Sequence, residues 1–408
     1  MKESFHSIAQ DIAALAPELS SIRHELHQIP EVGLHLPKTA ARVRAEIDAL
    51  GLEVHECESA TGFMAVLRGG ACTAAARRPI VLLRADMDAL PVQEDTGLDW
   101  ASTNGNMHAC GHDLHTAGLI GAMRVLCARR EELAGDVVFM FQSGEEGWHG
   151  AQHMINEGLL DAAGRTPDHA YGVHVWSSRY PAGYIGTRPG PMMASSDSMA
   201  ITIHGHGGHG SAPHETRDPI PVAASIVTEA QVMVAREFNI FDPVVATCGQ
   251  IHAGTIANVI PNTAFLEFTL RTLSSASRER LIRRLRELAE HTAAAHGMRA
   301  ECKLVELYPV TMNDPDEYEF AADTISSVFP ERWQLQETPM AAAEDFSQVL
   351  EKIPGVFIGV SAVNPGEDHT SLPFNHSPHA RFRDDAIADA ATILATLAYR
   401  RLSGSGTS

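Results

Sequence analysis

Apolar residues in this chain alternate between short strand-like runs and stretches with helical spacing. Residues 39–50 and 112–129 place their apolar or small side chains on one helical face. One face of the second helix has unusually small side chains and should pack closely; it contains Leu114, Gly118, Gly121 and Val125. Strand-like runs occur at residues 79–84, 137–141, 169–176 and 355–361. This alternation predicts an α/β fold whose central mixed, mostly parallel sheet is flanked by helices.

The pattern changes between about residues 194 and 305. Strand patterns there cover residues 199–204, 244–252, 263–272 and 299–304, and helical patterns cover residues 219–236 and 277–296. Their order, βαββαβ, is the ferredoxin-like pattern. We therefore predict a catalytic domain made of residues 1–190 and 307–402, an inserted lid or dimerisation domain over residues 191–306, and a disordered tail over residues 403–408.

Length and composition narrow the class of protein. A chain of 408 residues with 44% hydrophobic and 20% charged residues favours a soluble protein with two domains. The net charge of -20 argues against a nucleic-acid or anionic membrane surface. No apolar run is long enough to span a membrane, and the first residues do not show the pattern expected of a signal peptide. Six scattered cysteines favour reduced thiols in the cytoplasm.

Residues with metal-binding side chains follow the predicted strands. The candidates are Cys110, His112, Glu145, Glu146, His174 and His376. Cys110 and His112 are two positions apart, so in an extended loop they point the same way. The two adjacent glutamates would point apart in extended chain, so one can bind metal while the other faces a water molecule. Thiolate, imidazole and carboxylate groups bind zinc, manganese or cobalt. The alternative is a buried thiol beside hydrogen-bonded loop imidazoles.

Three neighbouring polar residues have a less certain place in this pattern. Asp88 belongs to the run 84–91 at the end of a predicted strand. It could orient a metal-binding histidine as a hydrogen-bond acceptor, or it could lie in a solvated turn. His108 and His115 flank the candidate ligands and are interpreted either as bystanders or as residues that support the ligands.

Four polar residues of the inserted region are candidates for substrate contacts. His209 and His214 lie in a glycine-rich run that lacks the Lys-Ser/Thr pair of a phosphate-binding loop. Glycine lets a backbone approach another surface closely, and a histidine held there can donate to developing negative charge. Asn258 and Arg271 suit a substrate carboxylate. Each of the four also has a purely structural interpretation.

Together these blocks resemble the metal-dependent amidohydrolase branch of the family that includes glutamate carboxypeptidase, aminoacylase and succinyl-diaminopimelate desuccinylase. Within that branch the chain is similar to hippurate hydrolases, N-acyl-L-amino acid amidohydrolases and plant auxin-conjugate hydrolases. The resemblance extends from residues 26–31 to the segment of His376. Its most specific blocks are residues 84–91, 108–115, 207–214 and 254–261. It implies a zinc-peptidase-like catalytic sheet with an inserted ferredoxin-like lid.

The resemblance also implies roles for individual residues. Two divalent ions per subunit (Zn, Mn or Co) would be bound by Cys110, His112, Glu146, His174 and His376. Glu145 would be the general base that activates water, with Asp88 as its companion. His209 would reach the substrate from the lid together with Asn258, Arg271 and His214. In this family a lid histidine typically serves the site of the partner subunit.

Two positions depart from the pattern of the branch. Ser143-Gly144 precedes the paired glutamates where Pro-Ala is common, and Asn375 precedes His376 where Leu is common. Neither change removes a ligand, but both could reshape the pocket for the acyl group.

The sequence thus predicts a cytoplasmic, homodimeric metallo-amidohydrolase that hydrolyses N-acyl amino acids to a carboxylic acid and a free amino acid. Its partners would be small-molecule substrates and a second copy of the chain, without nucleic acid or membrane. One alternative is a dipeptidase or carboxypeptidase of the same family, and a dipeptidase would need a site for a free α-amino group. The other is a non-catalytic metal-binding protein, against which the intact Glu145 argues.

Overall fold

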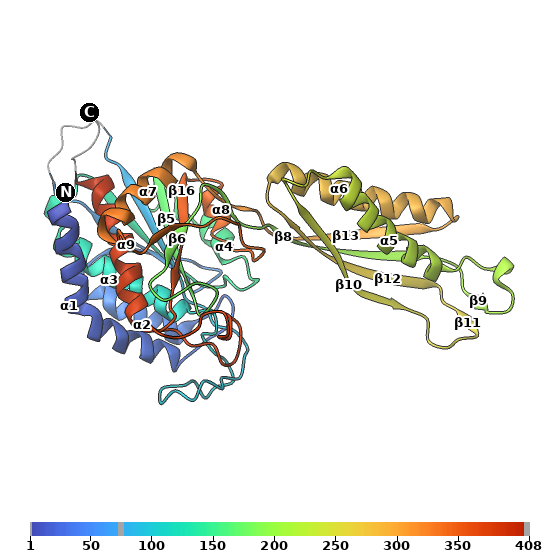
Figure 1. The fold of residues 1–408 in the computed structure, drawn as a ribbon, viewed down its shortest axis with the longest axis horizontal. Helices are drawn as coiled ribbons and strands as arrows, with labels where there is room; N and C mark the ends of the chain where they lie inside the picture. The colour runs from blue at the N-terminus through green and yellow to red at the C-terminus, as the bar shows by residue number, and fades with distance from the viewer. Residues whose placement is uncertain (1, 72–76, 404–408) are drawn as a thin grey trace. The chain divides into compact units, whose positions relative to one another are not determined.

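The computed structural model describes residues 2–71 and 77–403, which form two compact units (Figure 1). Unit 1 contains the described residues of 1–192, 312–338 and 348–408, and unit 2 contains residues 193–311 and 339–347. The predicted insertion covers residues 191–306 and does not include residues 339–347, which the structure adds to unit 2. Cys72 and all of the predicted tail except Ser403 lie outside the described residues.

Unit 1 is built on an eight-stranded sheet with the order β1-β2-β4-β3-β5-β16-β6-β15. The strands in that order are β1 (Glu53–Glu56), β2 (Phe63–Arg68), β4 (Asp136–Gln142), β3 (Ile80–Asp86), β5 (His169–Trp176), β16 (Gly355–Ser361), β6 (Ile185–Thr187) and β15 (Trp333–Leu335). The central strands β4, β3, β5 and β16 are parallel, while β1, β2 and β6 pair with a neighbour in the antiparallel direction. All residues of β3, β4 and β16 are buried, which explains their continuous apolar runs. The predicted mixed, mostly parallel sheet is confirmed.

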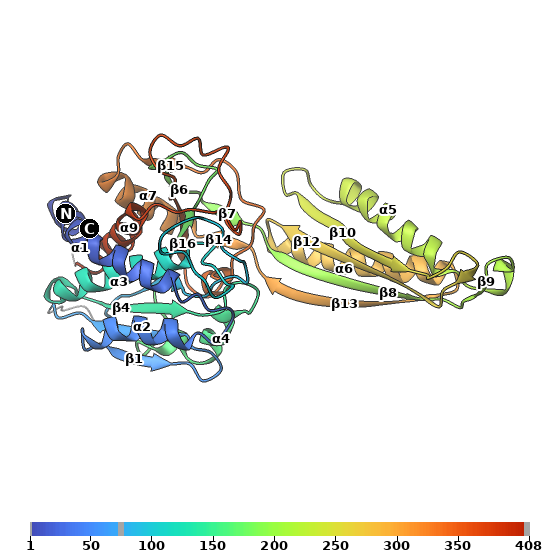
Figure 2. The same cartoon turned by 90° about the horizontal axis from the view of Figure 1, so that it is seen from below.

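Helices flank this sheet (Figures 1 and 2). They are α1 (Lys2–His27), α2 (Pro37–Asp48), α3 (His112–Ala128), α4 (Gly150–Asn156), α7 (Pro315–Val328), α8 (Ser347–Leu350) and α9 (Asp385–Leu402), with short 3-10 helices η1 (Arg130–Glu132) and η2 (Leu159–Asp161). The small face of α3 packs closely, as expected. A Cβ atom added at Gly121 would lie 2.8 Å from Leu19 of α1 and 3.1 Å from Ala391 of α9.

Unit 2 is a four-stranded antiparallel sheet with the order β10-β12-β8-β13. Its elements along the chain are β8 (Ser196–His204), α5 (Pro219–Glu237), β10 (Val244–Ala253), β12 (Thr263–Thr272), α6 (Ser275–Ala295) and β13 (Arg299–Tyr308). Figure 2 shows α5 and α6 on one face of this sheet. Burial alternates along β8 because only this face is covered. The predicted ferredoxin-like βαββαβ order is confirmed.

Smaller elements complete the two units. A two-stranded ribbon of β9 (Gly208–His209) and β11 (Val259–Ile260) extends from unit 2, where η3 (Pro213–Glu215) follows it. Strands β7 (Gly190–Met193) and β14 (Thr311–Asn313) form a second short ribbon. Within the described parts of the chain, no helix combines the length and the apolar character that crossing a membrane requires.

Candidate metal centre

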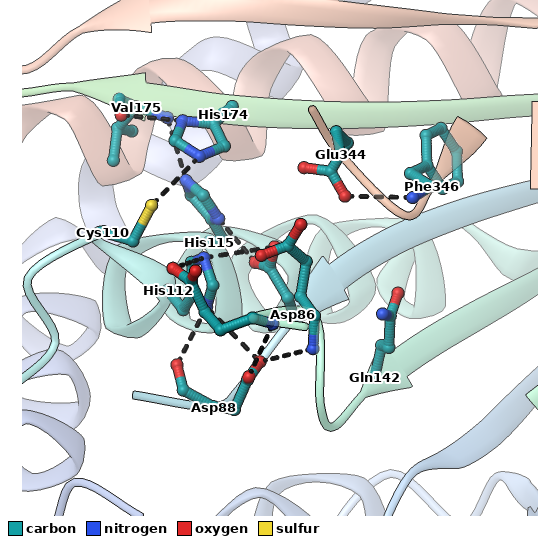
Figure 3. A network of polar contacts seen from close by, with 12 residues as sticks. Asp86, Asp88, Cys110, His112, His115, Gln142, His174, Val175, Glu344 and Phe346 are labelled. Atoms are coloured by element: carbon teal, nitrogen blue, oxygen red, sulfur yellow. Dashed lines mark hydrogen bonds and ion pairs between the residues drawn. The ribbon is translucent and has the colours of Figure 1, made fainter. Parts of the chain in front are cut away.

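The candidate ligands gather because three parallel strands end at the same edge of the unit 1 sheet. The run that contains Asp88 follows β3, Glu145 and Glu146 follow β4, and His174 lies in β5. In open parallel sheets the carboxyl ends of the strands meet at one edge, which is where ligands usually bind. Figure 3 shows these segments converging.

The carboxylate of Asp88 holds the paired glutamates in place. Its Oδ1 accepts a hydrogen bond from the main-chain N–H of Glu145 at 3.0 Å, and its Oδ2 accepts one from Glu146 at 3.1 Å. The acceptor that orients His112 is instead the main-chain oxygen of Asp88, at 2.8 Å from Nδ1. Asp88 is fully buried, so the solvated turn considered from the sequence is wrong.

Glu145 and Glu146 lie in a turn, so the expectation of extended chain at this point is wrong. The turn follows Gly144, whose φ of +72° favours glycine, and Asp88 captures both of its N–H groups. One ligand atom each of Glu145, Glu146 and His112 lies within 4.8 Å of the others. Both carboxylates therefore reach the same cluster, although the residues are adjacent in the sequence.

Cys110 and His112 are also brought together by a turn and not by an extended loop. Gly111 between them has a φ of +91° and forms the N-terminal cap of α3, so His112 is the first residue of that helix. A Cβ atom at Gly111 would lie 2.5 Å from Cγ2 of Val175, which leaves room only for glycine. The two side chains form a buried group with His174.

The Cys110 sulfur lies between two histidines. Its Sγ is 3.4 Å from Nε2 of His174 and 3.3 Å from Nε2 of His376. The same His376 nitrogen is 3.1 Å from Oε1 of Glu146. Cys110 therefore belongs to two groups of potential ligands, one with His112 and His174 and one with Glu146 and His376. The five predicted metal-binding residues form one continuous cluster.

His376 closes the cluster on its solvent side. Its side chain is 53% exposed, whereas those of Cys110, His112 and His174 are buried. It is one of few non-glycine residues with a positive φ, here +73°, a conformation that costs about 1 kcal/mol or more and is found often at functional sites. A substrate can approach the cluster from the side of His376.

The hydrogen bonds of two histidines leave a nitrogen available for metal. Nδ1 of His112 donates to the oxygen of Asp88, and Nδ1 of His174 donates to the oxygen of Val175 at 2.8 Å. When the rings are neutral, as a metal ligand requires, their Nε2 atoms carry the lone pairs that face the cluster. Among the described residues, the buried Nε2 of His112 has no hydrogen-bond partner. The donor set of one thiolate, three imidazoles and a carboxylate fits zinc, manganese or cobalt.

The electrostatics of the cluster favour a bound cation. Contacts with the Cys110 sulfur and with Glu146 raise the pKa of His376 to about 10. Burial lowers the pKa of His112, but Asp86 and Cys110 raise it by more. Burial holds the pKa of His174 well below its usual value, so this imidazole stays neutral, as a metal ligand must.

Asp86 and His115 complete the surroundings of the cluster: Asp86 had no predicted role, and His115 takes the supporting role that was one of its two interpretations. Oδ1 of Asp86 accepts from Nδ1 of His115 at 2.6 Å, while Oδ2 lies 2.7 Å from Nη1 of Arg84 and 3.4 Å from Nε2 of His112 (Figure 3). The other nitrogen of His115 accepts the N–H of Val175 at 2.9 Å. Both nitrogens of His115 thus make hydrogen bonds, and one of them holds Asp86 in place.

A buried ion network lies on the other side of the ligand loop. The carboxylate of Asp113, next to His112, accepts from Nε of Arg23 and from Nδ1 of His27, both at 2.9 Å. Nε2 of His27 is 3.1 Å from Oε2 of Glu94. Burial lowers the pKa of His27, but the hydrogen bonds to Asp113 and Glu94 raise it by more, to about 9. The network therefore holds His27 in its protonated form.

This proton should make the free energy of unfolding depend on pH. With a pKa raised from 6.5 to about 9, His27 contributes stability that is complete below pH 6.5 and is lost as the pH rises through 9. The shift corresponds to about 3 kcal/mol at most. Chemical denaturation of the wild type and of His27→Gln at about pH 6 and about pH 10 should show the difference between them shrinking by this order. The same difference at both pH values would mean that His27 is neutral in the folded protein.

In unit 2 the structure brings two of the four predicted substrate residues together. His209 pairs with Val259 in the β9–β11 ribbon, and the N–H of Gly210 donates to the oxygen of Asn258 at 2.8 Å. Both His209 and Asn258 are exposed. His214 is exposed too, with Glu215 as its ion-pair partner at 3.8 Å.

Arg271 lies elsewhere in unit 2. It is near the end of β12, eight residues after Thr263, which is about 27 Å at the usual rise of an antiparallel strand. The ribbon with His209 lies beyond the Thr263 end of the sheet, where Gly207 bonds to Asn262 (Figure 1). Within one chain, His209 and Arg271 are therefore too far apart to hold the same small substrate.

Arg271 lines a small apolar cavity of unit 2. The cavity measures about 160 Å³, and its other lining residues include Val245, Leu273 and Met340. Nη1 of Arg271 donates to Oγ1 of Thr269 and to the oxygen of Leu270, both at 2.8 Å. A half-buried guanidinium beside apolar side chains can bind a carboxylate that carries an apolar group.

Comparison with known proteins agrees with this geometry. Residues 82–400, which include every predicted metal-binding residue, match the model of a protein family described as peptidase family M20/M25/M40. The chain belongs to this family. The resemblance that the sequence motifs indicated is thereby confirmed at the level of the family.

Individual members of the family are similar over nearly their whole length. A thermostable carboxypeptidase from Saccharolobus solfataricus is 34% identical over 96% of this chain and 98% of its own. An N-acetylcysteine deacetylase from Bacillus subtilis is 34% identical over 94% of this chain and 97% of its own. A crystal structure of a dinuclear metal-binding peptidase of the M20 family, also from Bacillus subtilis, has a TM-score of 0.80 at 31% identity and covers 95% of this chain and 98% of its own.

Proposed function

We propose that this M20 family member hydrolyses the amide bond of N-acyl amino acids, with two divalent ions held by Cys110, His112, Glu146, His174 and His376. The observation that carries the proposal is the continuous cluster itself. It contains two overlapping groups of ligands that share Cys110, and Glu145 lies within reach of one member of each, His112 and Glu146. A cluster built only for metal storage would not need a second carboxylate at this point.

Glu145 is the proton carrier in this mechanism. Divalent ions in the cluster would supply Lewis acidity, which polarises a carbonyl group and makes water more acidic. The carboxylate of Glu145 takes one proton from the attacking water as the water oxygen adds to the carbonyl carbon. Glu145 then gives this proton to the amide nitrogen, the C–N bond breaks, and a carboxylic acid and an amine leave. The carboxylate of Asp88 fixes the position of Glu145 by accepting a hydrogen bond from the main-chain N–H of Glu145.

The substrate class rests on two kinds of support. The relatives include a deacetylase of an N-acetyl amino acid and a carboxypeptidase, and substrates of both kinds present an amide bond next to a free carboxylate. Arg271 is suited to bind that carboxylate, and the apolar residues around it are suited to a side chain. The alternatives within the family are a carboxypeptidase or dipeptidase activity.

A panel of substrates tests this choice. The enzyme loaded with Zn, Mn or Co should hydrolyse acetyl-, benzoyl-, long-chain-acyl- or indoleacetyl-amino acids with a higher kcat/KM than dipeptides with a free α-amino group. The matched pair for each amino acid is its N-acetyl derivative and its glycyl dipeptide, which differ by a single amino group. Faster hydrolysis of the dipeptides would replace the proposal by a dipeptidase, and no turnover of any member would leave a metal-binding protein without this activity.

We also propose that the chain forms a homodimer through unit 2 and acts in the cytoplasm. Strands β10 and β13 are the edges of the unit 2 sheet, and β10 exposes Val245 and Ile251 by 46% and 54%. Exposed apolar edge strands are suited to pairing with a second copy. The five described cysteines are all free, and a reducing compartment would keep Cys110 as the thiol that metal binding requires.

A further inference from the structure

Asn375 lies directly before the ligand His376 and makes four hydrogen bonds through its amide group. Its Nδ2 donates to the main-chain oxygens of Cys110 and Val175, each at 3.0 Å. Its Oδ1 accepts from the N–H and from the hydroxyl of Ser177, each also at 3.0 Å, and the hydroxyl shares its one hydrogen with the oxygen of Pro373 at 3.0 Å. The residue is 8% exposed. An amide side chain has two donor hydrogens and two acceptor lone pairs, so the capacity of Asn375 is fully used.

These bonds join three segments that carry ligands. One donor hydrogen goes to the residue that supplies the thiolate. The other goes to Val175, whose oxygen also accepts from Nδ1 of His174 at 2.8 Å. His376 is the next residue in the chain. Asn375 therefore links Cys110, which supplies the sulfur, with His174 and His376, the two histidines beside it.

The Asn375 amide also approaches the sulfur itself. Nδ2 of Asn375 lies 3.8 Å from Sγ of Cys110, within the range of a hydrogen bond to sulfur. Hydrogen bonds to a thiolate stabilise its lone pairs and tune the metal that the thiolate binds. Asn375 is thus placed to affect the electronic state of the thiolate as well as its position.

The neighbouring Phe374 contacts the same ligand set by a separate route. The ring of Trp176 stacks on the ring of His174, with centroids 4.1 Å apart, and Phe374 stacks on Trp176 at 6.1 Å. The guanidinium of Arg179 lies 3.9 Å above Phe374. The tripeptide 374–376 is therefore connected to the ligand set by the packing of Phe374 on Trp176, by the hydrogen bonds of Asn375 and by the ligand side chain of His376.

We propose that Asn375 is a positioning residue of the metal centre. It fixes the geometry of Cys110, His174 and His376, and the hydrogen that its Nδ2 directs at the oxygen of Cys110 is shared weakly with the thiolate of the same residue. The inference rests on the ligand set proposed above.

The test compares three variants for the binding of cobalt. Asn375→Leu keeps the approximate shape of the side chain and removes all four hydrogen bonds, so the affinity of the metal-free protein for Co²⁺ should fall by about 10- to 100-fold. The charge-transfer absorption from the Cys110 thiolate to Co²⁺ should move to longer wavelength, because sulfur lone pairs without a donor lie higher in energy. Ser177→Ala, which removes one of the four bonds, should lower the affinity in the same direction by a smaller factor.

The matched control is Asn313→Leu. Asn313 is buried like Asn375, and its amide ties its own strand to two other segments, through Thr187 and Arg188 on one and Phe357 on the other, at 2.8 Å each. None of these is a proposed metal-binding residue. This variant should lose stability like Asn375→Leu but keep the wild-type affinity for Co²⁺ and the wild-type absorption band.

The outcomes separate this inference from the proposed function. If the wild type shows no thiolate-to-cobalt band, or if Cys110→Ser keeps the band, the ligand set itself is wrong. If the band is present but Asn375→Leu has wild-type affinity and absorption, or if Asn313→Leu changes both equally, Asn375 has no special role at the metal. If Asn375→Leu does not fold, Ser177→Ala decides: unchanged affinity in that variant overturns the inference.

Discussion

Replacing Glu145 by Gln should lower kcat by about two to four orders of magnitude while the metal content stays unchanged. The amide of Gln has nearly the same shape as the carboxylate, but it cannot take a proton from water or pass one to the leaving nitrogen. The hydrogen bond to Asp88 comes from the main-chain N–H of Glu145 and not from the Glu145 side chain, so the turn should persist in the variant. Steady-state kinetics and elemental analysis of the same preparation measure the two quantities.

Glu146→Gln is the matched control for this prediction. Glu146 has the same type of side chain in the same turn, and its main-chain N–H is held by the same Asp88 carboxylate. Its Oε1 contacts His376 at 3.1 Å and belongs to the group that contains Cys110. This variant should therefore lose metal affinity, and adding metal should restore part of its activity. If the two variants behave alike, the division into a base and a ligand is wrong.

The second large effect is expected at His209. The side chain is exposed on the β9–β11 ribbon, where a donor can meet negative charge that develops on the substrate carbonyl oxygen. Removing such a donor typically costs about 100- to 1000-fold in kcat. His209→Ala should show a loss of this size with unchanged metal content, because no proposed ligand lies in unit 2. The control is His291→Ala, which removes an exposed imidazole of α6 that has no proposed role and should leave kcat unchanged.

Mixed dimers test whether His209 serves the site of the partner subunit. Within one chain His209 and Arg271 lie at opposite ends of the unit 2 sheet, so a substrate that uses both would need two subunits. Mixing the inactive variants His209→Ala and Glu145→Gln should regenerate activity, since one composite site in the mixed dimer has both wild-type residues. Differently tagged chains would show that subunits exchange. No recovery in proven mixed dimers would mean that His209 acts within its own subunit or has no catalytic role.

Much of the catalytic unit could be predicted because its pattern is local. Strands β3, β4 and β5 are continuous apolar runs, and the polar residues at their ends must meet at one edge once the strands are parallel. The helix that begins at His112 has a regular spacing of small residues. The βαββαβ order of unit 2 could be predicted in the same way, because each element is longer than a turn and its apolar residues repeat with the spacing of a helix or a strand.

The details of the site depend on contacts between distant residues. The turn at Glu145 forms because Asp88, 57 residues earlier, captures its N–H. The amide of Asn375 bonds to residues 265 and 200 positions away, so no local spacing could reveal its role. Asp86 lies in the same run as Asp88, but only the fold shows that Arg84 and His115 hold it beside His112.

The most direct test of the central claim is the removal and return of metal. Dialysis against a chelator, with elemental analysis to verify the metal-free state, should abolish the hydrolysis of N-acyl amino acids. Adding Zn, Mn or Co should restore it and saturate at about two ions per subunit, whereas Cys110→Ser should bind metal more weakly and Cys127→Ser should behave as the wild type. Full activity in protein verified to be free of metal would contradict the account.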